Sequence, residues 1–121
     1  MLHVVKYDIQ TRSELNLREH WAARHRRATK QKQAVVWTMY EAVRAPGWKI
    51  YFPVHVTLTR IGPRALDPDN CACSFKHVQD AIASVLGVDD GDTKRVRWTY
   101  KQRKGMPGEY AVEAVFKCKG A

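Results

Sequence analysis

The stretch from Arg64 to Asp92 differs in charge from the rest of the chain, and this difference constrains the fold more than any other feature. It contains six of the twelve acidic residues but only two of the twenty-one Lys and Arg residues, which gives it a formal charge of −4 and leaves +13 on the remainder. Clustered carboxylates repel one another and resist burial, so core packing does not explain them. A divalent cation would neutralise them, because Mg²⁺ is commonly held by one or two carboxylates and phosphate oxygens. With the basic remainder holding a polyanion over that metal, the pattern predicts a metal-dependent nuclease.

The carboxylates of this stretch form two short segments, D-P-D-N at residues 67–70 and D-D-G-D at residues 89–92. Each has an ordinary structural interpretation, the first as a turn and helix N-cap and the second as a loop between two elements. Either segment alone favours that interpretation, because such turns are common. Their position at both ends of one expected helix, which also carries Lys76, favours a functional site instead.

The order of these residues resembles the RusA-like Holliday junction resolvases of bacteria and prophages. The shared pattern is D-x-D-N, then a helix with F-K-x-x-x-D, then D-D after an apolar step. Length and element order extend the resemblance over most of the chain, whereas its specific part is residues 67–92. Pro68 stands where the family often has an aliphatic residue, and Lys76 follows Asp69 by seven residues where the founding member has four. The matching positions are Asp67, Asp69, Asn70, Phe75, Lys76, Asp80, Asp89 and Asp90.

The resemblance implies that Asp67, Asp69 and Asp90 are catalytic carboxylates that bind Mg²⁺, and that Lys76 is a required catalytic lysine. It also implies a homodimer that cuts four-way DNA junctions and needs no small-molecule cofactor. Beside a metal-bound phosphate, Lys76 would stabilise the charge on the transferring phosphoryl group. Its structural alternative is an exposed ion pair with Asp80, four residues further along the helix. Two other functions remain open, a non-catalytic DNA-binding protein and a metal nuclease acting on flap DNA or RNA.

The formal net charge of +9 and the pI near 9.7 predict affinity for nucleic acid, and less readily for an anionic membrane. The basic residues gather in two segments, 18–32 and 94–104. Trp21, inside the first segment, either contacts a base or packs in the core. We expect phosphate contacts from Arg18, Arg24, Arg26, Arg27, Lys30, Lys94, Arg95, Arg97, Lys101, Arg103 and Lys104.

The sequence gives no indication of a membrane or secreted protein. Its longest apolar runs are far shorter than the ~20 residues of a spanning helix, and residues 1–9 lack the pattern of a secretory signal. Three cysteines, an odd number, favour a reducing cytoplasm over a disulfide framework. A zinc site is the less favoured alternative, because no second ligand pair has finger spacing; its ligands would be Cys71, Cys73, His77 and Cys118.

Hydrophobic periodicity predicts one α+β domain with a small mixed sheet in the order β-α-β-α-β-β. We expect helices at 28–45, with Thr29 as N-cap and Pro46-Gly47 as the stop, and at 70–86, ended by Gly87. The alternating segments predict strands at 3–9, 51–60, 94–102 and 109–117, with the last two paired as a hairpin.

The expected position of the carboxylates has a consequence for assembly. An extended D-x-D would direct Asp67 and Asp69 to the same side, but Asp69 and Asp90 would lie at opposite ends of a helix about 22 Å long. One Mg²⁺ binds its ligands at about 2.1 Å, so both groups cannot reach it across a straight helix. Either residues 87–92 fold back, or a second subunit supplies Asp90. We favour a two-fold dimer with two composite sites.

Overall fold

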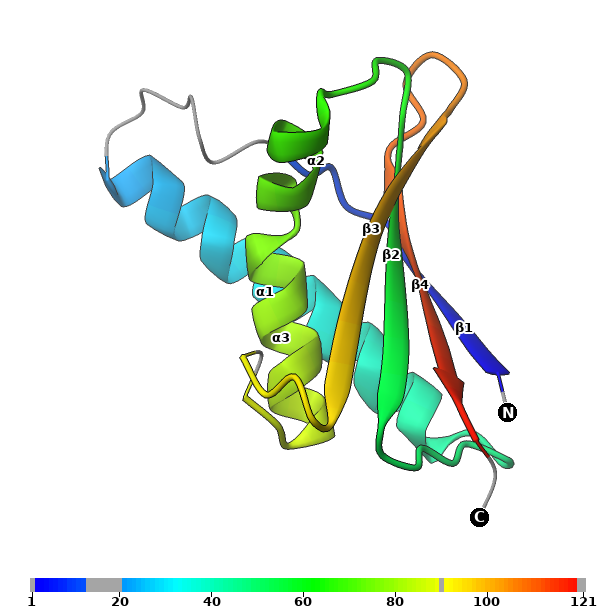
Figure 1. Ribbon diagram of the computed structural model, residues 1–121. Helices are drawn as coiled ribbons and strands as arrows, with labels where there is room; N and C mark the ends of the chain where they lie inside the picture. Colours follow the sequence, from blue (N-terminus) through cyan, green and yellow to red (C-terminus); the bar gives the residue numbers. More distant parts are fainter. Residues whose placement is uncertain (1, 13–20, 90, 120–121) are drawn as a thin grey trace.

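The computed structural model describes residues 2–12, 21–89 and 91–119 (Figure 1). They form the predicted α+β arrangement of a four-stranded mixed sheet and helices. The helix expected at 70–86 is divided into two. The elements, in order, are β1 (Leu2–Tyr7), α1 (Trp21–Arg44), β2 (Val54–Gly62), α2 (Pro68–Ser74), α3 (Lys76–Leu86), β3 (Val96–Lys104) and β4 (Ala111–Cys118).

The strand order is β1-β4-β2-β3, with β3 parallel to β2 and β4 antiparallel to both β1 and β2. The prediction of a hairpin between the last two strands was therefore wrong. Burial explains the difference: β4 has buried residues along most of its length and takes a central place, whereas β3 is exposed from Tyr100 onward and takes an edge. The parallel pair β2–β3 is joined through α2 and α3, as parallel strands require a crossover connection.

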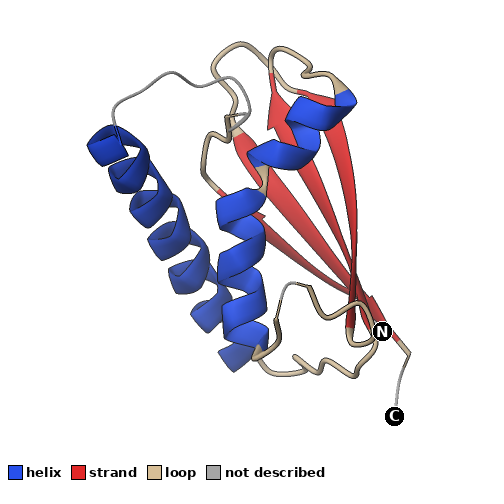
Figure 2. Ribbon diagram, turned by 60° about the vertical axis from the view of Figure 1, so that its left-hand side comes forward, coloured by secondary structure: helices blue, strands red, loops and turns tan. Residues whose placement is uncertain are grey.

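The helices cover one face of the sheet (Figure 2). Alternate residues of each strand point into the core, which confirms the predicted burial of Val54, Val56 and Leu58. Tyr7 is fully buried, and its hydroxyl donates to Met39 Sδ of α1 at 2.9 Å. The remaining core side chains come from both layers: Val5, Val35, Cys71, Phe75, Val78, Ala81, Ile82, Val96, Val112, Ala114, Phe116 and Cys118.

The first helix begins earlier than expected, and Thr29 lies inside it rather than at its N-cap. The extension carries few apolar residues, so hydrophobic periodicity did not detect it. The predicted helix ends are confirmed. α1 stops before Pro46-Gly47, and Gly87 ends α3 in the left-handed conformation (φ 76°), donating to the carbonyls of Ala83 and Ser84.

The break between α2 and α3 falls at Phe75, whose φ of −92° and ψ of 1° lie outside the helical region. Its ring is fully buried and stacks on that of Tyr100 of β3, with centroids 5.6 Å apart. The tertiary contact thus accompanies a change in direction that periodicity alone did not indicate. Among the described helices, none is long and apolar enough to cross a membrane.

Candidate functional site

Asp67 is the N-cap of α2. Its Oδ1 accepts from the Asn70 backbone N–H at 2.9 Å, and its Oδ2 accepts from Asn70 Nδ2 at 2.7 Å. These two hydrogen bonds hold the pKa of the Asp67 carboxyl below its usual range, and the bond from the Asn70 backbone has the larger effect. Pro68 at the first helical position suits this start, because it has no N–H to leave unpaired. A carboxylate has about four lone-pair sites, so the cap leaves Asp67 able to accept further ligands.

Asp69 lies in the first turn of α2 and is exposed. The expectation that Asp67 and Asp69 share one side of an extended backbone was therefore wrong, because Asp69 is already helical. Both carboxylates nevertheless lie at the same end of α2, in solvent. Hard oxygen ligands of this kind suit Mg²⁺, which usually takes one or two carboxylates and completes its shell with water and phosphate oxygens. The residues present thus fit such an ion.

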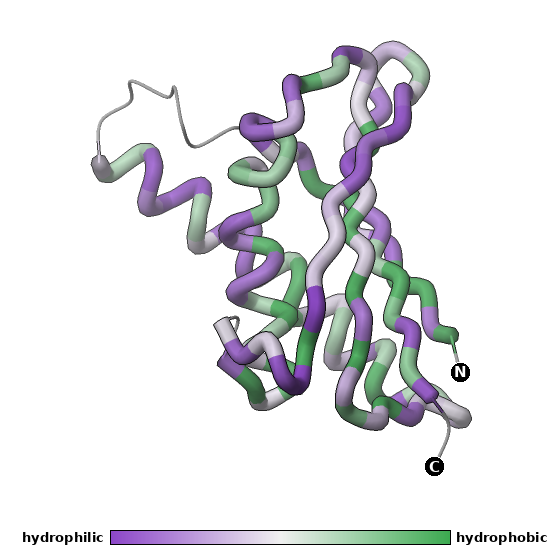
Figure 3. Tube along the Cα trace, viewed as in Figure 1, coloured by the Kyte–Doolittle hydropathy of each residue, from purple (hydrophilic) through white to green (hydrophobic). Residues whose placement is uncertain are grey.

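The loop that delivers Asp67 is held against β3. Gln102 Oε1 accepts from the Leu66 backbone N–H at 2.9 Å, and Gln102 Nε2 donates to the Leu66 carbonyl at 2.6 Å. This side-chain amide therefore satisfies both backbone groups of Leu66, in the way a neighbouring strand would. It fixes the residue before the N-cap to the hydrophilic end of β3, which reads K-Q-R-K (Figure 3).

A buried cation lies beneath the same loop. Arg60, on β2, is only 7% exposed, and its Nη1 donates to the Arg64 carbonyl at 2.8 Å. Gly62 leaves room for it, since a Cβ there would approach Arg60 Nη1 to 3.0 Å. Burial raises the pKa of the neighbouring Cys71 thiol, and the Arg60 charge offsets part of this rise. Arg60 and Gly62 thus support the turn that leads to the carboxylates.

Lys76 is the first residue of α3 and is exposed. Its structural alternative, an ion pair with Asp80, is not the pair observed: Asp80 Oδ2 lies 3.8 Å from Lys32 Nζ of α1. The pair joins α1 and α3, and both side chains are partly exposed, so it contributes little stability. Asp80 therefore pairs with α1 rather than with Lys76, and Lys76 is exposed at the junction of α2 and α3.

The second acidic segment forms a hydrogen-bonded loop after α3. Asp89 Oδ1 accepts from the Gly91 N–H at 3.0 Å. Asp92 Oδ1 accepts from the N–H groups of Lys94 and Arg95, and its Oδ2 pairs with Arg95 Nε at 2.9 Å. Asp92 thus organises the turn into β3, which confirms the loop interpretation for this residue. Asp90 lies outside the described residues.

The two acidic segments lie beside opposite ends of β3 (Figure 1). The Asp92 carbonyl accepts from the Val96 N–H at the start of the strand, whereas Leu66 is bound to Gln102 near its end. Six residues of strand separate these contacts, about 20 Å. Within residues 2–12, 21–89 and 91–119, no group of three or more His, Cys, Asp or Glu could hold a metal ion. The described part of one chain therefore places Asp67 and Asp69 at the same end of α2 but apart from Asp89 and Asp92, and it forms no zinc cluster.

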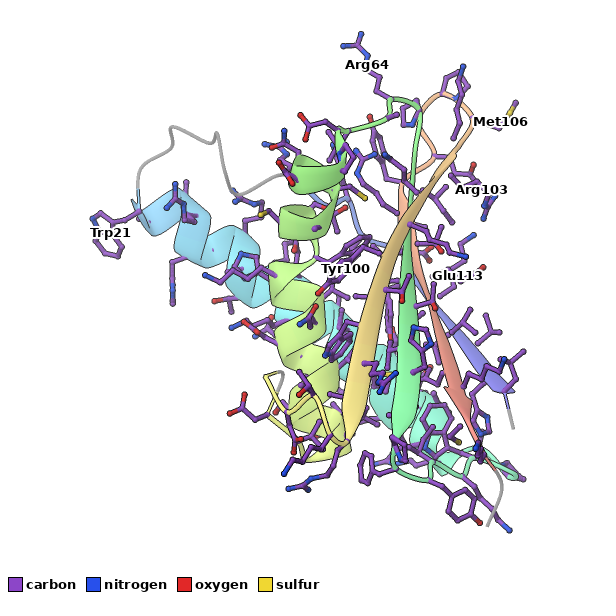
Figure 4. All side chains as sticks on the ribbon, viewed as in Figure 1. Trp21, Arg64, Tyr100, Arg103, Met106 and Glu113 are labelled. Atoms are coloured by element: carbon purple, nitrogen blue, oxygen red, sulfur yellow. The ribbon has the colours of Figure 1, made fainter. Side chains whose placement is uncertain are left out.

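The first basic segment occupies the start of α1. Arg24, Arg26 and Lys30 are exposed and Arg27 is partly buried, while Arg18 lies outside the described residues. Trp21 is 73% exposed and points into solvent (Figure 4), so its alternative as a core residue was wrong. Basic and aromatic side chains thus share one exposed helical end, which suits phosphate contacts and stacking on a base.

Three cations of the second basic segment point to the same face of β3. The ring of Tyr100 points toward the helices and Arg103 points to the opposite side (Figure 4). Alternation places Arg97 and Lys101 on the side of Arg103, which no described helix covers. Lys94 and Arg95 precede the strand and Lys104 ends it; all six cations are exposed.

Comparison with protein-family models and with curated protein sequences finds no match. The site residues that periodicity and charge missed are Gln102 and Arg60. Gln102 was missed because its role is a contact with the backbone of Leu66, 36 positions away. Arg60 was missed because its role depends on its burial beneath the loop, where it donates to the Arg64 carbonyl. A polar residue between basic ones in an alternating strand is the one signal that could have indicated Gln102.

Proposed function

We propose that this protein is a Mg²⁺-dependent endonuclease that cuts branched DNA, with four-way junctions as its principal substrate, and that its α+β arrangement is of the RusA-like kind. The observation that carries the proposal is the pair of exposed carboxylates at the start of α2, Asp67 and Asp69, in a chain of formal charge +9. The element order and the D-x-D-N and F-K-x-x-x-D patterns also support it.

Asp67 and Asp69 would hold Mg²⁺, with Asp90 as a third ligand. The ion would supply an activated water and stabilise the leaving oxygen. The chain's own contribution is position and charge. The Asn70 hydrogen bonds keep Asp67 ionised and oriented, and Gln102 ties the loop to β3. Lys76 would direct its ammonium toward the phosphoryl group as negative charge develops there.

A second candidate, a DNA-binding protein without catalytic activity, is favoured by one observation. Asp67, Asp89 and Asp92 each accept hydrogen bonds within their own cap or loop, so all three have structural roles. In that case the acidic stretch would only shape the helix start and the turn before β3.

Cleavage of a labelled four-way junction, with Mg²⁺ and with excess EDTA, separates the candidates. Linear duplex, flap DNA and RNA serve as control substrates. We expect Mg²⁺-dependent nicking of the junction and its loss by about 100-fold or more in Asp69→Asn. The matched control is Asp80→Asn, which removes a carboxylate of the following helix, α3, that pairs with Lys32. If both variants cleave the junction equally well, or if the unaltered protein does not cleave it, the carboxylates have a structural role only.

A further inference from the structure

A groove lined by basic side chains lies at one end of the sheet, where β2 and β3 begin and β4 ends. Its volume is about 740 Å³, within the range of ligand pockets. Two of the lining cations, Lys117 and Lys119, come from the C-terminal end of β4 and its continuation. No Asp or Glu of the described chain lines this groove. The other polar and basic lining residues are His55, Thr93, Lys94 and Arg97.

The register of the sheet explains why these cations gather. His55 of β2 is paired with Lys117 of β4 on one side and with Arg97 of β3 on the other. Adjacent strands lie about 4.8 Å apart, so the three side chains form one row on the face that no described helix covers. Lys117 and Arg97 flank His55 in this row and lie two strands, about 9.6 Å, apart. An anion seated over His55 would lie within reach of both cations.

The other rows of this face do not carry the same charge. In one, Lys6 of β1, Glu113 of β4, Thr59 of β2 and Lys101 of β3 are paired in sequence, so a carboxylate stands among the cations. In the next, Val4, Val115, Thr57 and Thr99 are paired in sequence and carry no charge. In the last, Ala111, Ile61 and Arg103 contribute one cation. Among the described rows, the one at the groove thus combines two cations with no carboxylate.

We propose that this groove binds a phosphate of the nucleic-acid backbone, and that Lys117 and Lys119 act there together with Lys94 and Arg97. Ammonium and guanidinium groups donate charge-assisted hydrogen bonds to phosphate oxygens. The His55 ring is held beside them by a hydrogen bond of 2.6 Å between its Nε2 and Thr99 Oγ1. The identification of DNA as the polyanion rests on the proposed function.

The groove lies one strand length from the candidate cleavage site. From Arg97 to Arg103 the strand β3 extends about 20 Å, and Gln102 near its end holds the loop of Asp67. Between them, Thr99 and Lys101 point to the same face as Arg97. Gln102 points to the helix side of this edge strand, so a DNA strand held in the groove would pass Lys101 and cross the edge of β3 to reach the carboxylates.

The test compares Lys117→Gln with Lys6→Gln. Both residues are exposed on the same sheet face and each variant loses one positive charge, but Lys6 is paired with Glu113 outside the groove. Binding of a four-way junction is measured against salt concentration. For Lys117→Gln we expect affinity to fall about 3- to 10-fold and the slope of log affinity against log salt to fall by about 0.9, one phosphate contact. Lys6→Gln should change neither, and a Lys117→Gln/Lys119→Gln double variant should add to the effect.

Failure of the groove and failure of the nuclease proposal give different results. If Lys117→Gln and Lys6→Gln change junction affinity equally and have the same unfolding temperature, phosphate binding in the groove is contradicted. That result would not bear on cleavage. If Lys117→Gln weakens junction binding more than Lys6→Gln but no Mg²⁺-dependent cleavage is found, the groove proposal is supported and the nuclease proposal is contradicted. An unaltered protein that binds no DNA would overturn both.

Discussion

The side-chain amide of Gln102 pairs with both backbone polar groups of Leu66, at 2.9 Å and 2.6 Å, and so joins the loop before Asp67 to strand β3. Two residues 36 positions apart thereby set where the carboxylate end of α2 lies relative to the basic edge strand. The contact connects the two halves of the proposed site, the metal ligands and the DNA-binding surface.

Gln102→Ala should remove both hydrogen bonds and release the loop. Net contributions of about 0.5–1.5 kcal/mol per hydrogen bond give an expected loss of about 1–3 kcal/mol in the free energy of unfolding. The rate of junction cleavage should also fall, by about 10- to 100-fold, because the ligand loop loses its position. Urea unfolding and cleavage rates measure the two effects. Gln33→Ala, an exposed glutamine on α1, is the control; equal losses in both variants would contradict the anchoring role.

Asp67 is expected to combine two roles that substitutions can separate. Asp67→Ser keeps an N-cap acceptor but removes the carboxylate, whereas Asp67→Ala removes both. We expect urea unfolding of Asp67→Ser to stay close to that of the unaltered protein and Asp67→Ala to unfold at lower urea. Cleavage should fall about 100-fold or more in both. Full activity in a stable Asp67→Ser protein would restrict this residue to capping.

The buried phenol of Tyr7 predicts a specific loss of stability in alkali. Burial raises the pKa of Tyr7 far above its ordinary value of about 10, because the phenolate would lose its hydration. A folded-state pKa above the unfolded one contributes stability below about pH 10 that is lost as the pH rises above that value. The free energy of unfolding should therefore fall less between about pH 9 and pH 11 in Tyr7→Phe than in the unaltered protein. Parallel pH profiles for the two would refute this.

Much of the fold could be predicted, because it depends on local patterns. The alternation of Val54, Val56 and Leu58, the stop at Pro46-Gly47 and the left-handed Gly87 each follow from neighbouring residues. The hairpin was wrong because the order of strands is decided by long-range burial, here of β4 between β1 and β2. The break at Phe75 likewise accompanies a stacking contact with a strand that comes later in the chain.

The candidate site could be predicted only in its chemistry. Acidic and basic clusters can be identified from the sequence, and the acidic cluster indicated Asp67 and Asp69 as candidate metal ligands. The contacts that hold Asp67 and Asp69 in place could not be predicted, because the Gln102–Leu66 pair and the groove around Lys117 depend on tertiary pairing. The role of Arg60 depends on its burial, which its charge does not indicate. Asp92 illustrates the opposite case, since a carboxylate of the acidic stretch proves to be bound within its own turn.

Binding of junction DNA should weaken steeply as salt rises, through the cations of α1 and β3. Each phosphate contact adds about 0.9 to the slope of log affinity against log salt. Replacing Arg24, Arg26 and Lys30 by Gln should lower that slope by up to about 2.7 if all three contact phosphates. Lys49→Gln, an exposed lysine outside both basic segments, should leave it nearly unchanged. A slope near zero in the unaltered protein would remove the electrostatic explanation of the +9 charge.

The separation of the acidic segments along β3 favours an active site shared by two subunits. Asp67 and Asp69 lie at one end of the strand, and Asp89 and Gly91, the neighbours of Asp90, follow α3 at the other (Figure 1). In a two-fold dimer with antiparallel copies of this region, the start of α2 in one chain would meet the loop after α3 in its partner.

Complementation tests this arrangement. Inactive Asp69→Asn and Asp90→Asn proteins are mixed and allowed to exchange subunits, and nicking of a four-way junction is measured. If sites are shared, a mixed dimer has both lesions in one site and leaves the other intact, so up to about half of the mixed population should regain one active site. If each site is built within one chain, both sites of the mixed dimer are damaged and activity stays absent. Sedimentation of the unaltered protein as a monomer at assay concentration would exclude the shared site directly.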